Sequence, residues 1–131
     1  MPKEIGQLTQ LHSVWIYNNQ ITELPKEIGH LIHLQNLYMD NNKIIELPKE
    51  IGQLIKLERL YIKTNKITEL PKEIGQLTQL RELDISYNQI TKLPLEICSL
   101  LKLEEFYYFD NPIENLNDPI IIQFFNTIAN N

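Results

Sequence analysis

The sequence predicts an α/β solenoid with short parallel strands on its concave face, 3₁₀ or α turns on its convex face, and a capping helix at the C-terminus. Three observations lead to this prediction. Glycine and most proline recur every 23 residues, each interval contains one stretch of alternating apolar and polar residues, and the repeat stops near residue 116. The glycines are Gly6, Gly29, Gly52 and Gly75, and the prolines are Pro2, Pro25, Pro48, Pro71 and Pro94.

The repeat divides residues 1–116 into five units, which start at residues 2, 25, 48, 71 and 94. Four of them begin Pro-Lys-Glu-Ile-Gly, and every unit carries the frame L-x-x-L-x-L-x-x-N-x-L with apolar residues at the Leu positions. In the second unit the frame consists of Leu34, Leu37, Met39, Asn42 and Ile44. Five copies in register are a specific signal for an array of stacked coils.

Each unit contains one predicted strand, because the stretch x-L-x-L-x alternates with a period of two and so has one buried face. Such a strand is unstable alone, but stacked on its neighbours at about 4.8 Å it forms a parallel ladder over a continuous core. The asparagine behind the strand carries donors and an acceptor, so we expect a buried amide that bonds the backbone of its own and adjacent coils. These residues are Asn19, Asn42, Asn65, Asn88 and Asn111.

The second half of each unit is predicted to return the chain along the convex side. Ile28, Leu31 and Leu34 stand at i, i+3 and i+6, a spacing that suits a short 3₁₀ or α turn with one stripe facing inward. The proline at its start needs no amide donor there. Lysine and glutamate rows run along the same side, and we interpret them as a solvated face.

The two ends of the repeat region differ. Asp118 followed by Pro119 is a strong helix start, and the apolar residues behind it predict a helix within residues 117–131 that covers the core of the last coil. No comparable cap precedes the first coil, so we expect its apolar end to be covered by further sequence or by a second copy of the chain. The residues expected at that end are Ile5, Leu8, Val14 and Ile16.

The frame resembles the leucine-rich repeat family over residues 1 to about 116, in particular the short 23-residue class of bacterial, notably spirochaete-type, proteins. The resemblance implies a right-handed solenoid in the shape of a horseshoe, and a scaffold for protein interaction. It also implies a protein that is secreted or exposed at the cell surface and meets host molecules. The chain does not start with the basic and then apolar pattern of a signal peptide, so the sequence leaves both the cell surface and the cytoplasm open.

Composition and motif content disfavour other classes. Seventeen Asp and Glu against 12 Lys and Arg give a formal charge of -5, which makes nucleic-acid binding unfavourable. No apolar run reaches the roughly 18 to 20 residues of a membrane span. Phosphate-binding glycine loops, metalloprotease motifs and nucleophile elbows are absent from the sequence, so we predict no enzyme, no catalytic residue and no cofactor.

We predict no catalytic or metal-binding role for Cys98 or the histidines. The cysteine takes the slot that glycine holds in the earlier units, and we interpret it as a structural thiol rather than a nucleophile. His30 and His33 are three residues apart and could share one face of a convex turn. Two imidazoles lack the third ligand that a stable zinc site needs, so we predict no metal site.

The outward-facing strand positions form the candidate site. Seven of the 11 aromatic residues fall there. Tyr and Trp offer large rigid contact areas and are enriched at interaction hot spots, whereas the alternative is that ring stacking only holds neighbouring strands together. The predicted ligand-binding residues are Trp15, Tyr17, Tyr38, Asp40, Arg59, Tyr61, Lys63, Glu82, Asp84, Tyr87, Glu105, Tyr107 and Phe109.

We predict that this face, about 400 Å² in projection, makes the chain a recognition module for a protein or peptide. Arg59 and Lys63 are central, and acidic residues follow toward the C-terminal end, which favours a partner with a basic patch. The acidic residues are Glu82, Asp84, Glu104, Glu105 and Asp110. The alternative is an assembly element that forms a homo-oligomer through its uncapped first coil, and a third interpretation, one half of an effector enzyme, would need a further catalytic domain.

Overall fold

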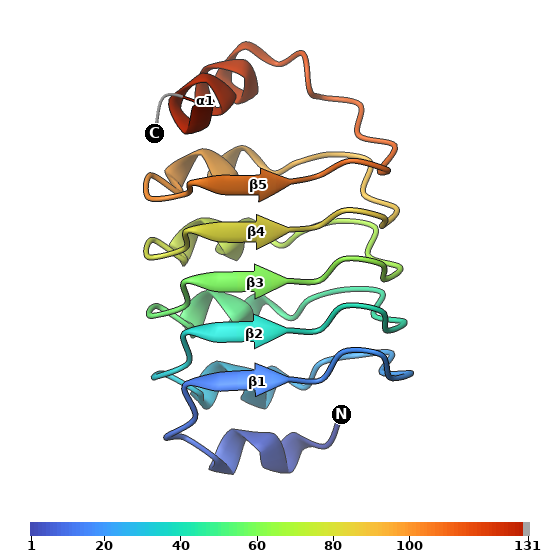
Figure 1. Cartoon of the computed structure of the whole chain (residues 1–131), viewed down its shortest axis with the longest axis vertical. Coiled ribbons are helices and arrows are strands. Elements are labelled where there is room, and N and C mark those ends of the chain that lie inside the picture. Colours follow the sequence, from blue (N-terminus) through green and yellow to red (C-terminus); the bar gives the residue numbers. More distant parts are fainter. Residues whose placement is uncertain (130–131) are drawn as a thin grey trace.

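A computed structural model of the chain describes residues 1–129 and contains one sheet of five short parallel strands. The strands follow one another in chain order, and each pairs with the next in a constant register, Ser13 with Asn36 and Asn36 with Arg59. Figure 1 shows them one above another, all running in the same direction. They are β1 (Ser13–Trp15), β2 (Asn36–Tyr38), β3 (Arg59–Tyr61), β4 (Glu82–Asp84) and β5 (Glu105–Tyr107).

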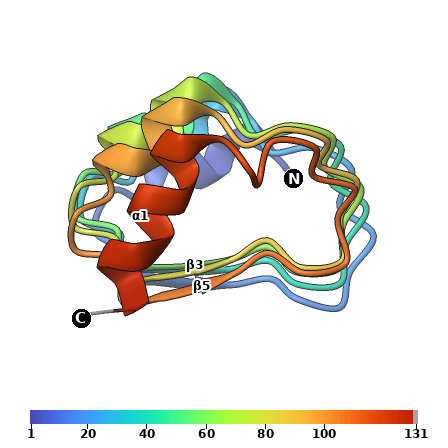
Figure 2. The ribbon, with the colours of Figure 1, turned by 90° about the horizontal axis from the view of Figure 1, so that it is seen from above.

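Short 3₁₀ helices form the opposite layer of the coils (Figure 2). Each follows a proline in an extended conformation and ends where a leucine N–H donates to the isoleucine carbonyl three residues earlier, as Leu31 does to Ile28 at 3.1 Å. The helices are η1 (Lys3–Gln7), η2 (Lys26–His30), η3 (Lys49–Gln53), η4 (Lys72–Gln76) and η5 (Leu95–Ser99). The predicted α/β solenoid is confirmed, with 3₁₀ rather than α-helical turns on its convex side.

The core between the two layers consists of aliphatic columns that run through successive coils. In the second coil Leu37 of β2, Ile28 of η2 and Ile44 of the return segment are all fully buried. Burial of one such side chain is worth roughly 1.5–3 kcal/mol. Since each column continues into the neighbouring coils, the stacking of coils stabilises the fold, and a single coil does not suffice.

Four asparagines form the predicted internal ladder. The side chain of Asn65 accepts a hydrogen bond from the Ile44 N–H of the preceding coil at 3.0 Å. It donates to the carbonyl oxygen of Met39 in that coil and to that of Ile62 in its own, both at 3.0 Å. The same arrangement is made by Asn42, Asn88 and Asn111. Asn19 instead donates only within its own coil and is exposed.

Helix α1 (Pro119–Ala129) packs on η5 and covers the last coil (Figure 1). It starts as predicted, because the Asp118 carboxylate accepts the Ile120 N–H at 2.9 Å. An aromatic cluster connects the helix with the last strand and consists of Phe106, Tyr108, Phe124 and Phe125. Residues 130–131 of the predicted capping segment lie outside the described residues.

The glycines of the repeat are required by the close approach of neighbouring coils and not by backbone conformation, since none has a positive φ. A Cβ atom on Gly75 would lie 2.5 Å from the carbonyl oxygen of Glu96 in the next 3₁₀ helix, and the three other glycines have the equivalent oxygen at 2.8–2.9 Å. Cys98 takes this slot in η5, where α1 lies beyond it and the Sγ is 3.8 Å from the Ile120 carbonyl oxygen. The side chain fits there because α1, and not another 3₁₀ helix, packs on η5.

At the N-terminal end of the stack, apolar side chains of the first coil face solvent. They surround a hollow of about 480 Å³. The prediction was wrong for Val14, which is only 6 % exposed because it lies in the core beneath the second coil. The residues that line the hollow are Met1, Pro2, Glu4, Ile5, Leu8, Ile16, Asn19 and Ile21.

Candidate binding surface on the concave face

The predicted site residues lie on one side of the sheet and on the turns that follow its strands. In β1 to β4 the middle residue is buried, so the two residues that flank it point to the opposite, concave side. The constant register aligns the last residues of the strands in one column. That column consists of Trp15, Tyr38, Tyr61, Asp84 and Tyr107.

Four rings at the N-terminal half of the sheet form a continuous row, named here the aromatic row: Tyr17, Trp15, Tyr38 and Tyr61. Successive ring centroids are 6.4, 4.2 and 5.0 Å apart. Trp15 is 62 % exposed and Tyr17 49 %, while Tyr38 and Tyr61 are half-buried between their neighbours. The cross-strand stacking that was the alternative interpretation therefore exists, and the row still presents a rigid apolar surface to solvent.

A second group of rings lies toward the C-terminal end and contains Tyr87, Tyr107 and Phe109. The Phe109 ring stands edge-on to both tyrosines, with centroids 5.9 Å from Tyr87 and 6.2 Å from Tyr107. The ammonium of Lys63 lies 5.4 Å from the Tyr87 ring centroid, within the range of a cation–π contact. The concave side thus carries two aromatic surfaces with charged residues between them.

Tyr87 occupies a left-handed backbone position, with φ of 55°. This conformation costs an ordinary residue about 1–2 kcal/mol and is easier for Asn and Asp. The fold imposes it here, since the Tyr87 N–H donates to the Phe109 carbonyl at 3.0 Å. An exposed ring is held at a strained position, which the sequence frame did not reveal. The equivalent residues of the other coils are Asn18, Asn41, Thr64 and Asp110.

Arg59 and Glu82 form an ion pair at the centre of the face. The Arg59 Nε donates to Glu82 at 3.0 Å, and its Nη1 donates to the Asn36 side chain at 3.2 Å. Burial acts to raise the pKa of Glu82, but hydrogen bonds from Tyr61 and Arg59 outweigh it, so this pKa is lowered. Burial, and then the hydrogen bond to Glu82, raises the pKa of Tyr61. The guanidinium and this carboxylate are therefore engaged with each other and with the sheet.

Two aspartates lie on the same face: Asp84 ends β4, and Asp40 follows β2. Burial raises the pKa of Asp40; the hydrogen bond from the Lys63 N–H, at 2.8 Å, opposes this shift, and the charge of Asp84 adds to it. Asp84 accepts the Ser86 N–H at 2.9 Å. In the described part of the chain neither aspartate forms an ion pair.

Tyr107 and Glu105 end the face on the C-terminal side. The Tyr107 hydroxyl donates to Glu105 at 2.8 Å. The pKa of Tyr107 is raised, first by this hydrogen bond and the charge of Glu105, then by burial and the charges of Asp84 and Glu82. Tyr107 thus lies close to the carboxylates of Glu105 and Asp84, in the part of the face that the sequence predicts to be acidic.

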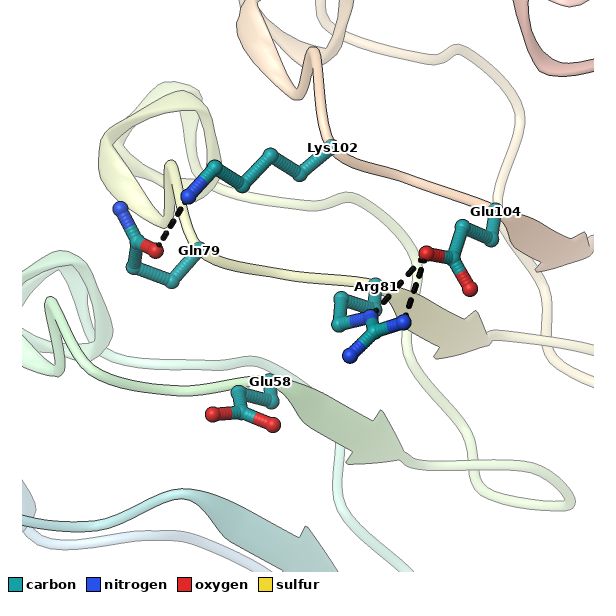
Figure 3. Close-up of a pocket in the computed structure, with 5 residues that line it drawn as sticks. All are labelled: Glu58, Gln79, Arg81, Lys102 and Glu104. Atoms are coloured by element: carbon teal, nitrogen blue, oxygen red, sulfur yellow. Dashed lines mark hydrogen bonds and ion pairs between the residues drawn. The ribbon is translucent and has the colours of Figure 1, made fainter. Parts of the chain in front are cut away.

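A polar hollow of about 420 Å³ lies beside the concave face, where the chain enters β3, β4 and β5 (Figure 3). Arg81 donates through Nε and Nη2 to one oxygen of Glu104, at 3.1 and 2.8 Å, and Lys102 donates to Gln79 at 2.7 Å. The charge of Glu104, which the sequence assigned to the acidic half, is thus paired with an arginine. Sequence reasoning missed this hollow because its residues come from three coils and match no motif. They are Glu58, Gln79, Arg81, Lys102 and Glu104.

The histidines and the cysteine lie elsewhere. The structure places His33 against His12, with ring centroids 6.2 Å apart, and not against His30. Burial, and then the charge of Asp118, raises the pKa of the Cys98 thiol, which makes it a weaker nucleophile at neutral pH. Among residues 1–129, no three or more His, Cys, Asp or Glu side chains are grouped so that they could hold a metal ion.

The repeat frame and the coil geometry agree with the family comparisons. A model of the leucine-rich repeat region matches residues 2–66, and a second leucine-rich repeat model matches residues 55–113. The chain belongs to the leucine-rich repeat family. Among solved structures it is similar to a leucine-rich repeat protein of Leptospira interrogans, with 45 % identity and a TM-score of 0.92 over 97 % of this chain. The match takes in 32 % of that protein, so the chain spans about a third of its length.

Solved structures of plant receptors are also similar. The peptide hormone receptor RGFR1, solved in complex with RGF2, matches 86 % of the chain at 30 % identity and a TM-score of 0.81, over 19 % of the receptor. The receptor kinase GASSHO1/SCHENGEN3 of Arabidopsis thaliana, in complex with CASPARIAN STRIP INTEGRITY FACTOR 2, matches 85 % at 33 % identity and a TM-score of 0.79, over 14 % of its length. No curated protein sequence matches significantly. Within the described residues, every helix is too short or too polar to cross a bilayer.

Proposed function

We propose that the chain is a protein-interaction module that binds a protein or peptide through its concave face. The aromatic row is the observation that carries the proposal, because it combines solvent exposure with rings that their neighbours already hold in place. Preordered Trp and Tyr side chains lose little entropy on binding and are common hot spots. The complexes of RGFR1 with RGF2 and of GASSHO1/SCHENGEN3 with its partner support the same class of function.

The size of the surface suits a peptide or a loop. Five strands about 4.8 Å apart make a sheet about 20 Å wide, on which each strand presents only a few residues. A standard protein interface needs roughly 800 Å² on each partner, about twice the projected area of this face. An extended segment that crosses the strands fits this surface better than a large globular partner.

Binding is also favoured over catalysis by the chemistry of the face. Asp40 is the carboxyl group with a raised pKa in the described residues, and its Oδ1 already accepts the Lys63 backbone N–H. Glu82 is held ionised by Arg59 and Tyr61. These two carboxylates therefore hold the strands and the Tyr61 ring in place.

The proposal is tested by selecting displayed random peptides on the immobilised protein and measuring the binders on variants. Trp15→Ala removes the most exposed ring of the row and leaves the core intact, so we expect binding to weaken at least tenfold. Ile55→Ala is the matched control, since it removes an exposed apolar side chain, 57 % accessible, from the turn between η3 and β3. Selected peptides that bind Trp15→Ala as tightly as they bind the unaltered protein would contradict the proposal.

A second candidate function is self-association through the first coil. The apolar hollow at this end and the exposed amide of Asn19 favour it, because the equivalent amides of later coils bond a neighbouring coil. Since α1 covers the opposite end, two copies would meet first coil to first coil about a two-fold axis.

The native mass across a concentration series tests self-association. We expect a dimer that Ile16→Glu dissociates and that Ile55→Glu leaves intact. A mass that stays at 15.5 kDa over the whole series would exclude this candidate.

A further inference from the structure

The cations of the concave face are already engaged within the protein. Arg59 pairs with Glu82 at 3.0 Å, and the Lys63 ammonium lies over the Tyr87 ring. In contrast, the described residues provide no cation partner at ion-pair distance for Asp84 or Glu105. The carboxylates of this surface that lack an ion-pair partner therefore leave it negative, and apart from Asp40, whose Oδ1 accepts the Lys63 backbone N–H, they lie toward β4 and β5.

These two carboxylates flank one ring. Asp84 is the register partner of Tyr107 on the neighbouring strand, and Glu105 accepts the hydroxyl hydrogen of the same tyrosine. Both charges help to raise the pKa of Tyr107, so their fields meet at this side chain. An aromatic face beside two carboxylates is an environment that suits a guanidinium or an ammonium, through cation–π attraction and charge. The protein already contains one such cation–π contact, between the Lys63 ammonium and the Tyr87 ring.

The spacing between this position and the aromatic row is set by the sheet. Tyr38, the centre of the row's cross-strand stack, lies on β2, whereas Asp84 and Tyr107 lie on β4 and β5 in the same column. Two to three strand separations of about 4.8 Å amount to about 10–14 Å. An extended chain covers this distance in about three or four residues, at roughly 3.3–3.6 Å each.

We infer that the concave face recognises an extended segment with two determinants: a large apolar or aromatic side chain on the aromatic row, and an arginine or lysine three or four residues away, against Tyr107, Asp84 and Glu105. The inference rests on the proposed function and specifies the chemistry of the partner. Charge complementarity favours a basic segment over an acidic one, since the protein also carries a net charge of -5.

The test uses the displayed library of random eight-residue peptides. Selection on the unaltered protein should enrich an apolar or aromatic residue together with Arg or Lys at a spacing of three or four. The double variant Asp84→Asn, Glu105→Gln keeps both acceptor oxygens and removes both charges. We expect it to bind the selected basic peptides about two- to fivefold more weakly per lost contact, in line with exposed ion pairs, and to keep the apolar preference.

Two controls isolate the charge effect. Glu46→Gln removes one exposed charge just before η3, away from the concave face, and should leave affinity unchanged. Added salt should reduce the advantage of basic over neutral peptides, since the charges are partly exposed.

The outcomes separate the two proposals. Two results would overturn the inference and leave the proposed function standing, provided that the peptides bind Trp15→Ala more weakly. Either the selected peptides have no basic residue at this spacing, or they bind the double variant as tightly as the unaltered protein. A selection in which no peptide distinguishes the unaltered protein from Trp15→Ala would overturn both.

Discussion

Replacement of Gly75 by alanine tests whether coil spacing depends on the absence of a side chain. The added Cβ would lie 2.5 Å from the Glu96 carbonyl oxygen and 3.0 Å from the Glu96 Cβ. Comfortable contacts of this kind are about 3.5 Å or longer, so η4 and η5 would have to separate by roughly 1 Å. The sheet and the asparagine ladder oppose that movement. Overpacking of this kind costs about 1–3 kcal/mol, which for a chain of this length lowers the melting temperature by roughly 3–15 °C.

Thermal unfolding followed by circular dichroism measures this effect. Cys98→Ala is the matched control, because it has the same Cβ in the same slot of η5, where α1 lies beyond it. We expect this control to change stability by less than about 1 kcal/mol. Equal melting temperatures for Gly75→Ala and the unaltered protein, or an equal loss for both variants, would refute the spacing argument.

Three further predictions concern single side chains and are checked by urea denaturation. Thr64→Asn should raise the unfolding free energy by about 1 kcal/mol, because a β-branched residue at φ 56° is strained and asparagine is not; an unchanged midpoint would count against this. Asn65→Ala should lower the unfolding free energy by about 2–4 kcal/mol, since three backbone partners lose their hydrogen bonds. Asn19→Ala should lower it clearly less, because Asn19 bonds only its own coil. Asp40→Asn keeps the acceptor for Lys63 and should stabilise the protein at pH 7: the raised pKa means that ionisation of Asp40 opposes folding. Well below the ordinary aspartate pKa of 3.8, the unaltered carboxyl is protonated in both the folded and the unfolded protein and the advantage should vanish, so a gain independent of pH would contradict it.

The repeat made much of the fold predictable from sequence. A period of 23 residues sets the strand register directly, because Trp15, Tyr38 and Tyr61 must stack if successive coils are equivalent. The same equivalence placed Asn65 in the ladder, and the chemistry of Asp118 set the start of α1. Each of these features depends on position within the coil and on little else.

Other features of the candidate site depend on side-chain partners that a repeat frame does not specify. The frame placed Arg59 and Glu82 on the face but did not show that they neutralise each other. It gave no dihedral angle, so the strained backbone of Tyr87 remained hidden. It also treated the first coil as a uniform open end, although the second coil buries Val14. Rotamers, φ angles and burial at the ends of a stack arise from the three-dimensional assembly.

Because the strand register is constant, the side chains on the concave face and the distances between them depend on different features of the chain. The residues at the outward positions set the first, and the number of coils sets the second. Duplication of the coil at residues 48–70 would leave every column continuous, and every asparagine after Asn19 would still have a preceding coil to bond. It would also move the carboxylates near Tyr107 about 4.8 Å further from Trp15, which is one to two residues of an extended partner. Substitutions at the outward positions would change which side chains are accepted, whereas gain or loss of a whole coil would change only their separation. For the partner proposed above, the composition and the length of the segment would therefore depend on different changes in the chain: substitutions would alter the first and the number of coils the second.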